Sequence, residues 1–503
     1  MIELRPGAVS LADLRRIWAG APVALAPSGW AAIDAAADAV ARIVASGRTV
    51  YGVNTGFGLL AQTRIPGERL EELQRNLILS HSCGLGDALS PEVVRLVIAL
   101  KAIGLGRGHS GVRRVVVERL LALLQADALP LIPSQGSVGA SGDLAPLAHM
   151  SAALLGEGRI ILAGETLAAG DALARLGLAP LVLGPKEGLA LINGTQVSTA
   201  IALDTLFTAE RVFASALVGG ALSVDALKGT DAAFDPRIHA ARGQPGQIAV
   251  ASALKRLLDG SEIRHSHEDC PRVQDPYSFR CQPQVMGACL DLIGNAARTL
   301  EIEANAVTDN PVVFAEGDEA LSGGNFHAQP VAFAADILTM ALCETGSISE
   351  RRTAVLVDPK MSGLPPFLVR DSGVNSGFMI AQVSAAALVS ENKSLAFPAS
   401  VDSIPTSANQ EDHVSMATHA ATKARRIAGN AAGVIGIELL TATQGIDFHA
   451  PLKTSPQLEA VRAAIRTNVP HYAADRYFAD DLAWAKEAVL NGSLCQGVAA
   501  DLF

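Results

Sequence analysis

The stretch SGFMIAQVSAAALVSENKSLA, residues 376–396, sets the expected fold class of this chain. Apolar residues recur in it at helical spacing: Phe378, Ala381, Ala385 and Leu388. Alanine favours helix, and its small side chain lets two helices approach closely. The stretch therefore predicts a helix that packs against other helices.

Long windows without proline surround this stretch. They lie between Pro185 and Pro236, Pro283 and Pro311, Pro330 and Pro359, Pro366 and Pro398, and Pro405 and Pro451. Their Ala, Leu, Ile and Glu content favours helices of roughly 25–40 residues, or about 40–60 Å at 1.5 Å per residue. We predict a mainly α fold, an elongated helical bundle, rather than a doubly wound sheet.

The N-terminal part of the chain has a different pattern. It contains more glycine and proline, and turn signals such as VNTGFG (53–58) and GLGRGHSG (104–111). We predict a mixed, loop-rich region over 1–195, a long-helix bundle over 196–400 and a helical C-terminal region over 401–503. A long loop is expected at CPRVQDPYSFRCQP, 270–283, and such loops are often functional.

Composition excludes several classes of function. The net charge is −10 and aromatic residues make up 4% of the chain, so a nucleic-acid-binding surface is not expected. No uninterrupted apolar run is long enough to predict a membrane span. The 6 cysteines include no C-x-x-C pair, which is typical of reduced thiols in a cytoplasmic protein.

The segment SVGASGDLAP, 137–146, places small residues around Ser141. It does not fit a G-x-S-x-G nucleophile elbow, and no lysine follows to complete a phosphate-binding loop. A structural turn is one reading. The other is ring closure between the Gly142 nitrogen and the Ala140 carbonyl, which small side chains and a glycine permit. Loss of two waters, one from Ser141, would then leave an electrophilic methylidene-imidazolone.

Motifs along nearly the whole chain favour the second reading. They are YGVNTGFGLL (51–60), NLILSHSCG (76–84), GSVGASGDLAPLAHM (136–150), INGTQVSTA (192–200), VQDPYSFRCQPQVMGA (273–288), EANAVTDNP (303–311), SGGNFHAQPVA (322–332), GVNSGFMIAQ (373–382) and SVDSIPTSANQEDHVSM (400–416). In this order they resemble the histidine ammonia-lyase family, within the wider aromatic amino-acid ammonia-lyases and aminomutases.

The resemblance implies the fold and the cofactor. The fold would be that of the fumarase/aspartase-like superfamily, in a homotetramer whose active sites combine more than one chain. Ala140, Ser141 and Gly142 would form 4-methylidene-imidazol-5-one (MIO), with no external cofactor and no metal. The MIO would capture either the substrate amine or the substrate ring. Asp143 would orient the loop during cyclisation or cap the following helix.

The resemblance also implies roles for individual side chains. Tyr51 would remove the β-proton, although an unperturbed phenol with a pKa of ~10 is rarely ionised at neutral pH. Arg280 is the expected bidentate partner of the substrate carboxylate, with Tyr277 and Asn193 assisting. Gln274 is a weaker candidate on the same loop, and Phe326 is expected to pack near the MIO.

The substrate is expected to be L-histidine, converted to trans-urocanate and ammonia. His81, after Ser80, and Glu411 offer hydrogen-bond and charge partners for an imidazole. A purely apolar ring would leave a buried carboxylate unpaired. Met379 is a further contact or a helix-core methionine. Tyrosine or phenylalanine lyases, aminomutases and a helical scaffold protein are the alternatives that this sequence pattern disfavours.

Several positions differ from the common family pattern. They are Ser82 and Cys83, where alanines are common, Gln329, where glutamate is frequent, and Phe397, where histidine is common. None coincides with an expected site residue. A metal site at His265, His267 and Cys270 is disfavoured because a fourth ligand and a recognised spacing are missing.

Overall fold

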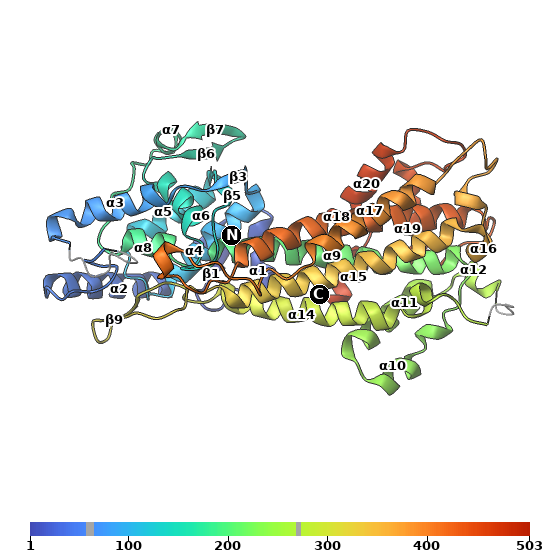
Figure 1. Cartoon of the computed structure of the whole chain (residues 1–503), viewed down its shortest axis with the longest axis horizontal. Helices are drawn as coiled ribbons and strands as arrows, with labels where there is room; N and C mark the ends of the chain where they lie inside the picture. The colour runs from blue at the N-terminus through green and yellow to red at the C-terminus, as the bar shows by residue number, and fades with distance from the viewer. Residues whose placement is uncertain (57–64, 268–272) are drawn as a thin grey trace. The chain divides into compact units, whose positions relative to one another are not determined.

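The structure, a computed structural model, describes residues 1–56, 65–267 and 273–503. These residues form helices far more than strands, which confirms the predicted mainly α fold class (Figure 1). Two compact units divide the chain. The first comprises 1–204, 297–336 and 398–422, and the second comprises 205–296, 337–397 and 423–503. The regions predicted from the sequence, 1–195, 196–400 and 401–503, are continuous segments, whereas each compact unit combines three separate segments. The three regions therefore stay a prediction.

The first unit contains the shorter elements and all the strands that the structure describes. Its helices are α1 (Leu11–Trp18), α2 (Pro27–Ala45), η2 (Gly67–Arg69), α3 (Leu70–His81), α4 (Pro91–Gly106), α5 (Arg114–Gln125), α6 (Leu144–Leu154), α7 (Ala169–Arg175), α8 (Glu187–Ile192) and η5 (Ser407–Asn409). Its strands are β1 (Ile2–Leu4), β2 (Val23–Leu25), β3 (Leu85–Ala88), β4 (Leu129–Pro130), β5 (Pro133–Gln135), β6 (Arg159–Leu162), β7 (Glu165–Ala168), β8 (Val312–Phe314) and β9 (Glu319–Leu321).

These strands form small sheets only. β1 pairs with β2 in parallel, while β3–β5, β4–β6–β7 and β8–β9 are antiparallel. The core of this unit is helical instead. Helix α4 has 13 buried residues out of 16, so it is surrounded on nearly all sides.

The second unit contains the other helices of the described chain. They are η3 (Ala232–Phe234), α10 (Pro236–Arg242), α11 (Pro245–Leu258), α12 (Glu262–His265), α13 (Tyr277–Arg280), α16 (Pro359–Ser362), η4 (Pro366–Leu368), α17 (Met379–Leu395), α19 (Pro456–Asn468), α20 (Ala479–Leu490) and α21 (Gln496–Leu502). Four longer helices contain the boundaries between the units: α9 (Gln196–Ala226), α14 (Gln282–Ala304), α15 (Gln329–Val357) and α18 (Ala417–Asp447).

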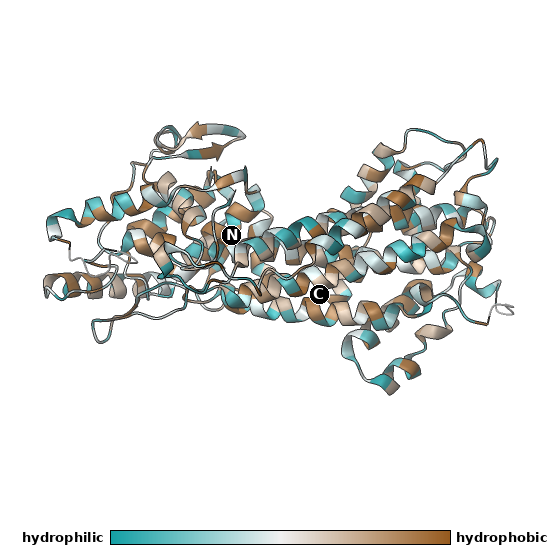
Figure 2. Ribbon diagram, viewed as in Figure 1, coloured by the Kyte–Doolittle hydropathy of each residue, from teal (hydrophilic) through white to brown (hydrophobic). Residues whose placement is uncertain are grey.

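The proline-free windows correctly locate these long helices. Helices α9 and α18 have 31 residues each and α15 has 29, within the expected length range. Helix α17 has only 17, because residues 371–377 include three residues with positive φ, Asp371, Gly373 and Gly377, and the helix starts only at Met379. Hydrophobic residues, brown in Figure 2, recur along the helices of both units.

The predicted loop at 270–283 is only partly a loop. Residues 277–280 form α13, and α14 already begins at Gln282. Residues 270–272 lie outside the described part of the chain. Pro276 immediately precedes α13, and Pro283 lies in the first turn of α14, where proline is tolerated.

Helix α15 is long and apolar enough, by length and composition, to cross a membrane. However, 67% of its apolar 18-residue window is buried inside the protein. It also contains Glu350 and Arg352, which are buried within the described chain. A core helix satisfies the same length and composition test, so the helix is weak evidence for a membrane span.

Candidate active site

Two glycines of the 137–146 loop adopt backbone angles that other residues rarely adopt. Gly139 has φ +65° and Gly142 has φ +72°. A Cβ on Gly142 would lie 2.1 Å from the carbonyl oxygen of Gly194, and one on Gly139 would lie 2.2 Å from Ser415 Oγ. Both positions therefore require glycine, and the loop lies directly against the backbone of residue 194.

Asp143 fixes the end of this loop. Its N–H donates to Gly194 O at 2.8 Å, next to a parallel bridge between Gly142 and Gly194. Its fully buried carboxylate accepts from the hydroxyls of Ser137, Ser198 and Thr418 at 2.7–2.9 Å, and from the Ser198 N–H at 2.7 Å. It makes no capping hydrogen bond to α6. Of the two roles considered for Asp143, the geometry therefore favours loop orientation.

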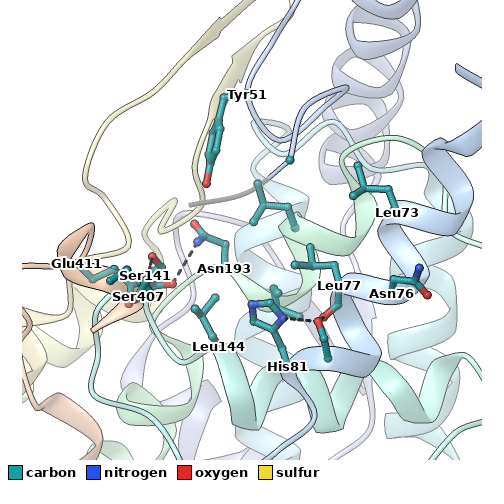
Figure 3. Close-up of a pocket in the computed structure, with 15 residues that line it drawn as sticks. Tyr51, Leu73, Asn76, Leu77, His81, Ser141, Leu144, Asn193, Ser407 and Glu411 are labelled. Carbon is teal, nitrogen blue, oxygen red and sulfur yellow. Dashed lines mark hydrogen bonds between the residues drawn. The ribbon is translucent and has the colours of Figure 1, made fainter. Parts of the chain in front are cut away.

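Ser141 lies between two polar side chains. Its hydroxyl donates to Glu411 Oε1 at 3.0 Å, and its carbonyl accepts from Asn193 Nδ2 at 3.2 Å (Figure 3). The second carboxylate oxygen of Glu411 accepts from Thr406 Oγ1 at 2.6 Å and Ser407 Oγ at 2.8 Å. Glu411 is thus oriented from one side and presents its other oxygen to Ser141.

The two hydroxyls that orient Glu411 were missed by the sequence analysis. They reach it because three consecutive non-glycine residues, Ser407, Ala408 and Asn409, have φ of 50°, 55° and 67°. Such left-handed runs are strained and occur preferentially at functional sites. The only signal in IPTSANQED was the presence of hydroxyl residues four and five positions before the acid, which alone indicates nothing.

A cavity of about 640 Å³ opens over Ser141 within the first unit. This size suits a small-molecule substrate. Its polar lining includes five of the predicted site residues: Tyr51, His81, Ser141, Asn193 and Glu411. Its apolar lining is supplied by α3, α6 and α8: Leu73, Leu77, Leu144, Leu189 and Ile192.

A second cavity of about 440 Å³ shares part of this lining. Tyr51, Ser141, Asn193 and Glu411 line both cavities, while Ala140 and Phe326 line the second. Phe326, which the resemblance places near the MIO, thus lines a cavity together with Ala140 and Ser141.

His81 is the last residue of α3 and lies across the first cavity from Glu411 (Figure 3). Its Nδ1 is 3.1 Å from Ser80 Oγ. Burial lowers the pKa of His81 below its usual value, although a hydrogen bond with the Leu77 backbone and the charge of Glu411 oppose the shift. This shift favours the neutral imidazole, which has one ring nitrogen as donor and the other as acceptor.

Tyr51 enters the cavity from a tight turn. The following Gly52 has φ +72°, and a Cβ there would lie 2.4 Å from Leu189 Cδ2. Figure 3 shows the hydroxyl end of Tyr51 directed toward Asn193 and Ser141. The glycine-rich segment that follows Tyr51 in the sequence extends into residues 57–64, which lie outside the described residues.

The other predicted site residues lie in the second unit. Arg280 NH2 donates to Gln274 Oε1 at 3.0 Å, and the Arg280 guanidinium lies 4.7 Å from the centroid of the Tyr277 ring. Tyr277 is 73% exposed. Met379 begins α17 in the same unit. None of these side chains lines either of the two cavities described above.

Three positions that differ from the family pattern, Cys83, Gln329 and Phe397, line neither of the two cavities. Cys83 is exposed, Gln329 Nε2 donates to Ser400 O at 3.0 Å, and Phe397 is 76% exposed. His265 Nδ1 is 2.6 Å from Ser261 O. Cys270 lies outside the described residues. Among the residues that the structure describes, no group of His, Cys, Asp and Glu is arranged to hold a metal ion.

Known proteins resemble this chain along almost its full length. Residues 9–467 match the family model described as aromatic amino acid lyase. Histidine ammonia-lyase from Burkholderia pseudomallei is 61% identical over 484 residues, which cover 96% of each chain. The crystal structure of histidine ammonia-lyase from Trypanosoma cruzi aligns with a TM-score of 0.92 at 41% identity, covering 100% of this chain and 96% of the other. Tyrosine aminomutase from Streptomyces globisporus aligns with a TM-score of 0.94 at 34% identity, covering 99% and 98%.

Proposed function

The chain belongs to the aromatic amino acid lyase family, and on that premise we propose that it eliminates ammonia from L-histidine to give trans-urocanate. One observation carries the choice of substrate. Among the polar side chains that line the cavity over Ser141, His81 and Glu411 are suitable partners for a ring that has nitrogens. Histidine ammonia-lyases are also the curated relatives at 61% identity.

The tripeptide Ala140-Ser141-Gly142 fits the MIO of this family. Ala140 is small and buried, and Gly142 has the positive φ and close backbone approach that a larger residue would prevent. The Ser141 carbonyl already accepts a hydrogen bond from Asn193, and Asp143 fixes the end of the loop. When formed, the MIO supplies an electrophile that makes the substrate amine a better leaving group.

Tyr51 is the proposed base for the β-proton. Its hydroxyl end is directed toward Ser141 and Asn193, so a substrate in the cavity would lie within its reach (Figure 3).

The buried Asn193 Oδ1 has no hydrogen-bond partner among the described residues. It is therefore available to accept from a substrate that carries an ammonium or amine group.

The imidazole ring distinguishes the proposed substrate, L-histidine, from phenylalanine and tyrosine. The imidazole of His81 and the carboxylate of Glu411 supply a donor or acceptor and a charge partner for the two ring nitrogens. A phenyl ring has no nitrogen to pair with these two partly buried polar groups, and sites built to hydrogen-bond a substrate reject analogues that lack the bonding atoms. Met379, in the second unit, is a proposed additional contact.

The substrate carboxylate requires a cation. Arg280 is proposed for this role, with Tyr277 and Gln274 beside it. Its Nε is buried without a hydrogen-bond partner among the described residues, so it retains a donor for a ligand. Because these residues belong to the second unit, we propose that a neighbouring copy of the chain supplies them in a homotetramer.

Exposed apolar side chains support this assembly. On α15, α17 and the segment after α17, large hydrophobic residues of the second unit are between 49% and 76% exposed: Met340, Ile380, Val383 and Phe397. Such exposure on a stable protein is typical of an interface. The cysteines that the structure describes are free, which is typical of the proposed cytoplasmic location.

Substrate choice is tested by assaying L-histidine, L-tyrosine and L-phenylalanine in parallel, each by the ultraviolet absorbance of its unsaturated product. We expect kcat/KM for histidine to exceed the other two by roughly 10²-fold or more, because the cavity pairs with ring nitrogens. Equal or better turnover of tyrosine would overturn the roles of His81 and Glu411.

Glu411→Gln tests the charge partner by itself. We expect kcat/KM for histidine to fall roughly 10–100-fold, since a hydrogen bond to a charged group contributes about 1.5–3 kcal/mol. The near-ultraviolet absorbance of the MIO serves as the control for an intact electrophile. Glu165→Gln is the matched variant, because Glu165 forms only an exposed pair with Arg175 at 2.9 Å. An unchanged kcat/KM in Glu411→Gln contradicts the proposed contact.

A further inference from the structure

A buried lysine, Lys101, binds the backbone of Asn193, whereas the side chain of Asn193 binds Ser141. Lys101 is on helix α4 and is 2% exposed. Nothing in the proposed reaction uses it. A lysine so deeply buried requires polar partners, because an unpaired ammonium is costly to remove from water.

Its partners are two backbone carbonyls at the end of α8. Lys101 Nζ donates to Asn193 O at 2.8 Å and to Ala190 O at 3.1 Å. The last carbonyls of a helix have no partner within the helix, and a lysine that binds them ends the helix in a defined place. Asn193 is the C-cap residue of α8, with extended backbone angles of φ −82° and ψ 134°.

The residue that Lys101 binds, Asn193, contacts the proposed MIO tripeptide directly. The side-chain amide of Asn193 donates to the Ser141 carbonyl at 3.2 Å. The next carbonyl, Gly194 O, accepts from the Asp143 N–H at 2.8 Å. The backbone at 193–194 is therefore bound by Lys101 on one side and by the tripeptide loop on the other.

The surroundings of Lys101 provide further charges. Lys186 and Asp309 form a buried ion pair at 2.6 Å, and Asp143 also acts on Lys101 electrostatically. Burial lowers the pKa of Lys101 to about 7, opposed by Asp309 and Asp143 and assisted by Lys186. An ammonium has three N–H donors and a neutral amine has two, so either form can serve both carbonyls.

We propose that Lys101 is a positioning residue for the lyase reaction: by binding the backbone carbonyl of Asn193 it orients the Asn193 amide against the Ser141 carbonyl. This role rests on the proposed function, since it assigns Lys101 an effect on the same site. It requires N–H donors at Nζ and does not require Lys101 to contact substrate.

The test is a double-mutant cycle of Lys101→Met with Asn193→Ala, assayed with L-histidine. In the otherwise native chain, Lys101→Met is expected to lower kcat roughly 10–100-fold, the usual effect of removing a group that orients a reacting one. KM is expected to change by less than about threefold, and the near-ultraviolet absorbance of the MIO to persist. In the Asn193→Ala background, the same substitution is expected to change kcat by less than about threefold, since the side-chain amide that Lys101 is proposed to orient is absent.

Ile103→Val is the control for loss of stability alone. Ile103 is fully buried on the same helix and lines neither of the two cavities over Ser141. It is expected to retain the kcat of the native chain. Should Lys101→Met fail to fold, Lys101→Leu replaces it in the same cycle, because leucine likewise has no side-chain N–H donor.

Several outcomes would overturn the positioning role. One is a native kcat in Lys101→Met, and another is an equal fractional loss of kcat in both backgrounds. Loss of the near-ultraviolet absorbance in Lys101→Met would place its effect in MIO formation instead and would also contradict the proposal. Absence of histidine turnover by the native chain in this assay contradicts the proposed function instead, so the two failures are distinguishable.

Discussion

A Ser141→Ala variant is expected to lose both its near-ultraviolet absorbance and nearly all turnover of L-histidine. Alanine has no hydroxyl to eliminate, so the methylidene of the MIO cannot form. We expect kcat to fall roughly 10³–10⁶-fold, the order lost when an enzyme's covalent group is removed. The measurements are a near-ultraviolet difference spectrum and the rate of urocanate formation.

The control for this variant is Ser151→Ala. Ser151 is fully buried on α6, and its hydroxyl donates to Leu147 O at 2.7 Å within the helix. The same chemical change there is expected to leave both the spectrum and kcat at native values. A Ser141→Ala variant with native activity would falsify the MIO proposal.

Tyr51→Phe is expected to retain the near-ultraviolet absorbance and to lower kcat roughly 10²–10⁴-fold, the usual contribution of a positioned acid or base. The phenyl ring keeps the packing of Tyr51 in the cavity and removes only the hydroxyl directed toward Ser141 (Figure 3). Steady-state kinetics of the variant across pH provide the measurement. Retained kcat would exclude Tyr51 as the base.

Two further variants accompany this one. Tyr477→Phe is the matched control, because Tyr477 is 79% exposed in the second unit and is expected to be dispensable.

Arg280→Lys tests whether one active site combines residues of two chains. If Tyr51 and Arg280 in one site come from different chains, assemblies that contain both Tyr51→Phe chains and Arg280→Lys chains recover turnover that neither variant shows alone. No recovery in mixed assemblies contradicts the proposed sharing of sites.

The fold class could be predicted because its signals are local. Proline-free windows rich in alanine and leucine predict helices wherever they occur, and α9, α15 and α18 lie in such windows. Element boundaries were harder. The start of α17 depends on left-handed backbone at Asp371 and Gly377, and α13 lies within a segment that was predicted to be a loop.

The residues chosen for the candidate site fall into two groups in the structure. Tyr51, His81, Ser141, Asn193 and Glu411 were chosen from motifs, and the first unit brings all five to one cavity. Arg280 and Tyr277 were chosen in the same way and lie beside one another in the second unit, so their participation stays a prediction. Motifs report residue identity, but they contain no information on which copy of a chain contributes each residue.

By itself, the sequence determined the chemistry available to this protein: a small Ala-Ser-Gly unit that can cyclise, a phenol, an amide, and an imidazole and carboxylate for the substrate ring. Only the tertiary structure decided how these groups are oriented. Ser141 and Glu411 are 270 residues apart in sequence yet hydrogen-bonded, and Lys101 reaches Asn193 across 92 residues. Residue type and local spacing are properties of neighbouring positions, whereas contacts of this range exist only after helices such as α4 and α8 have packed together.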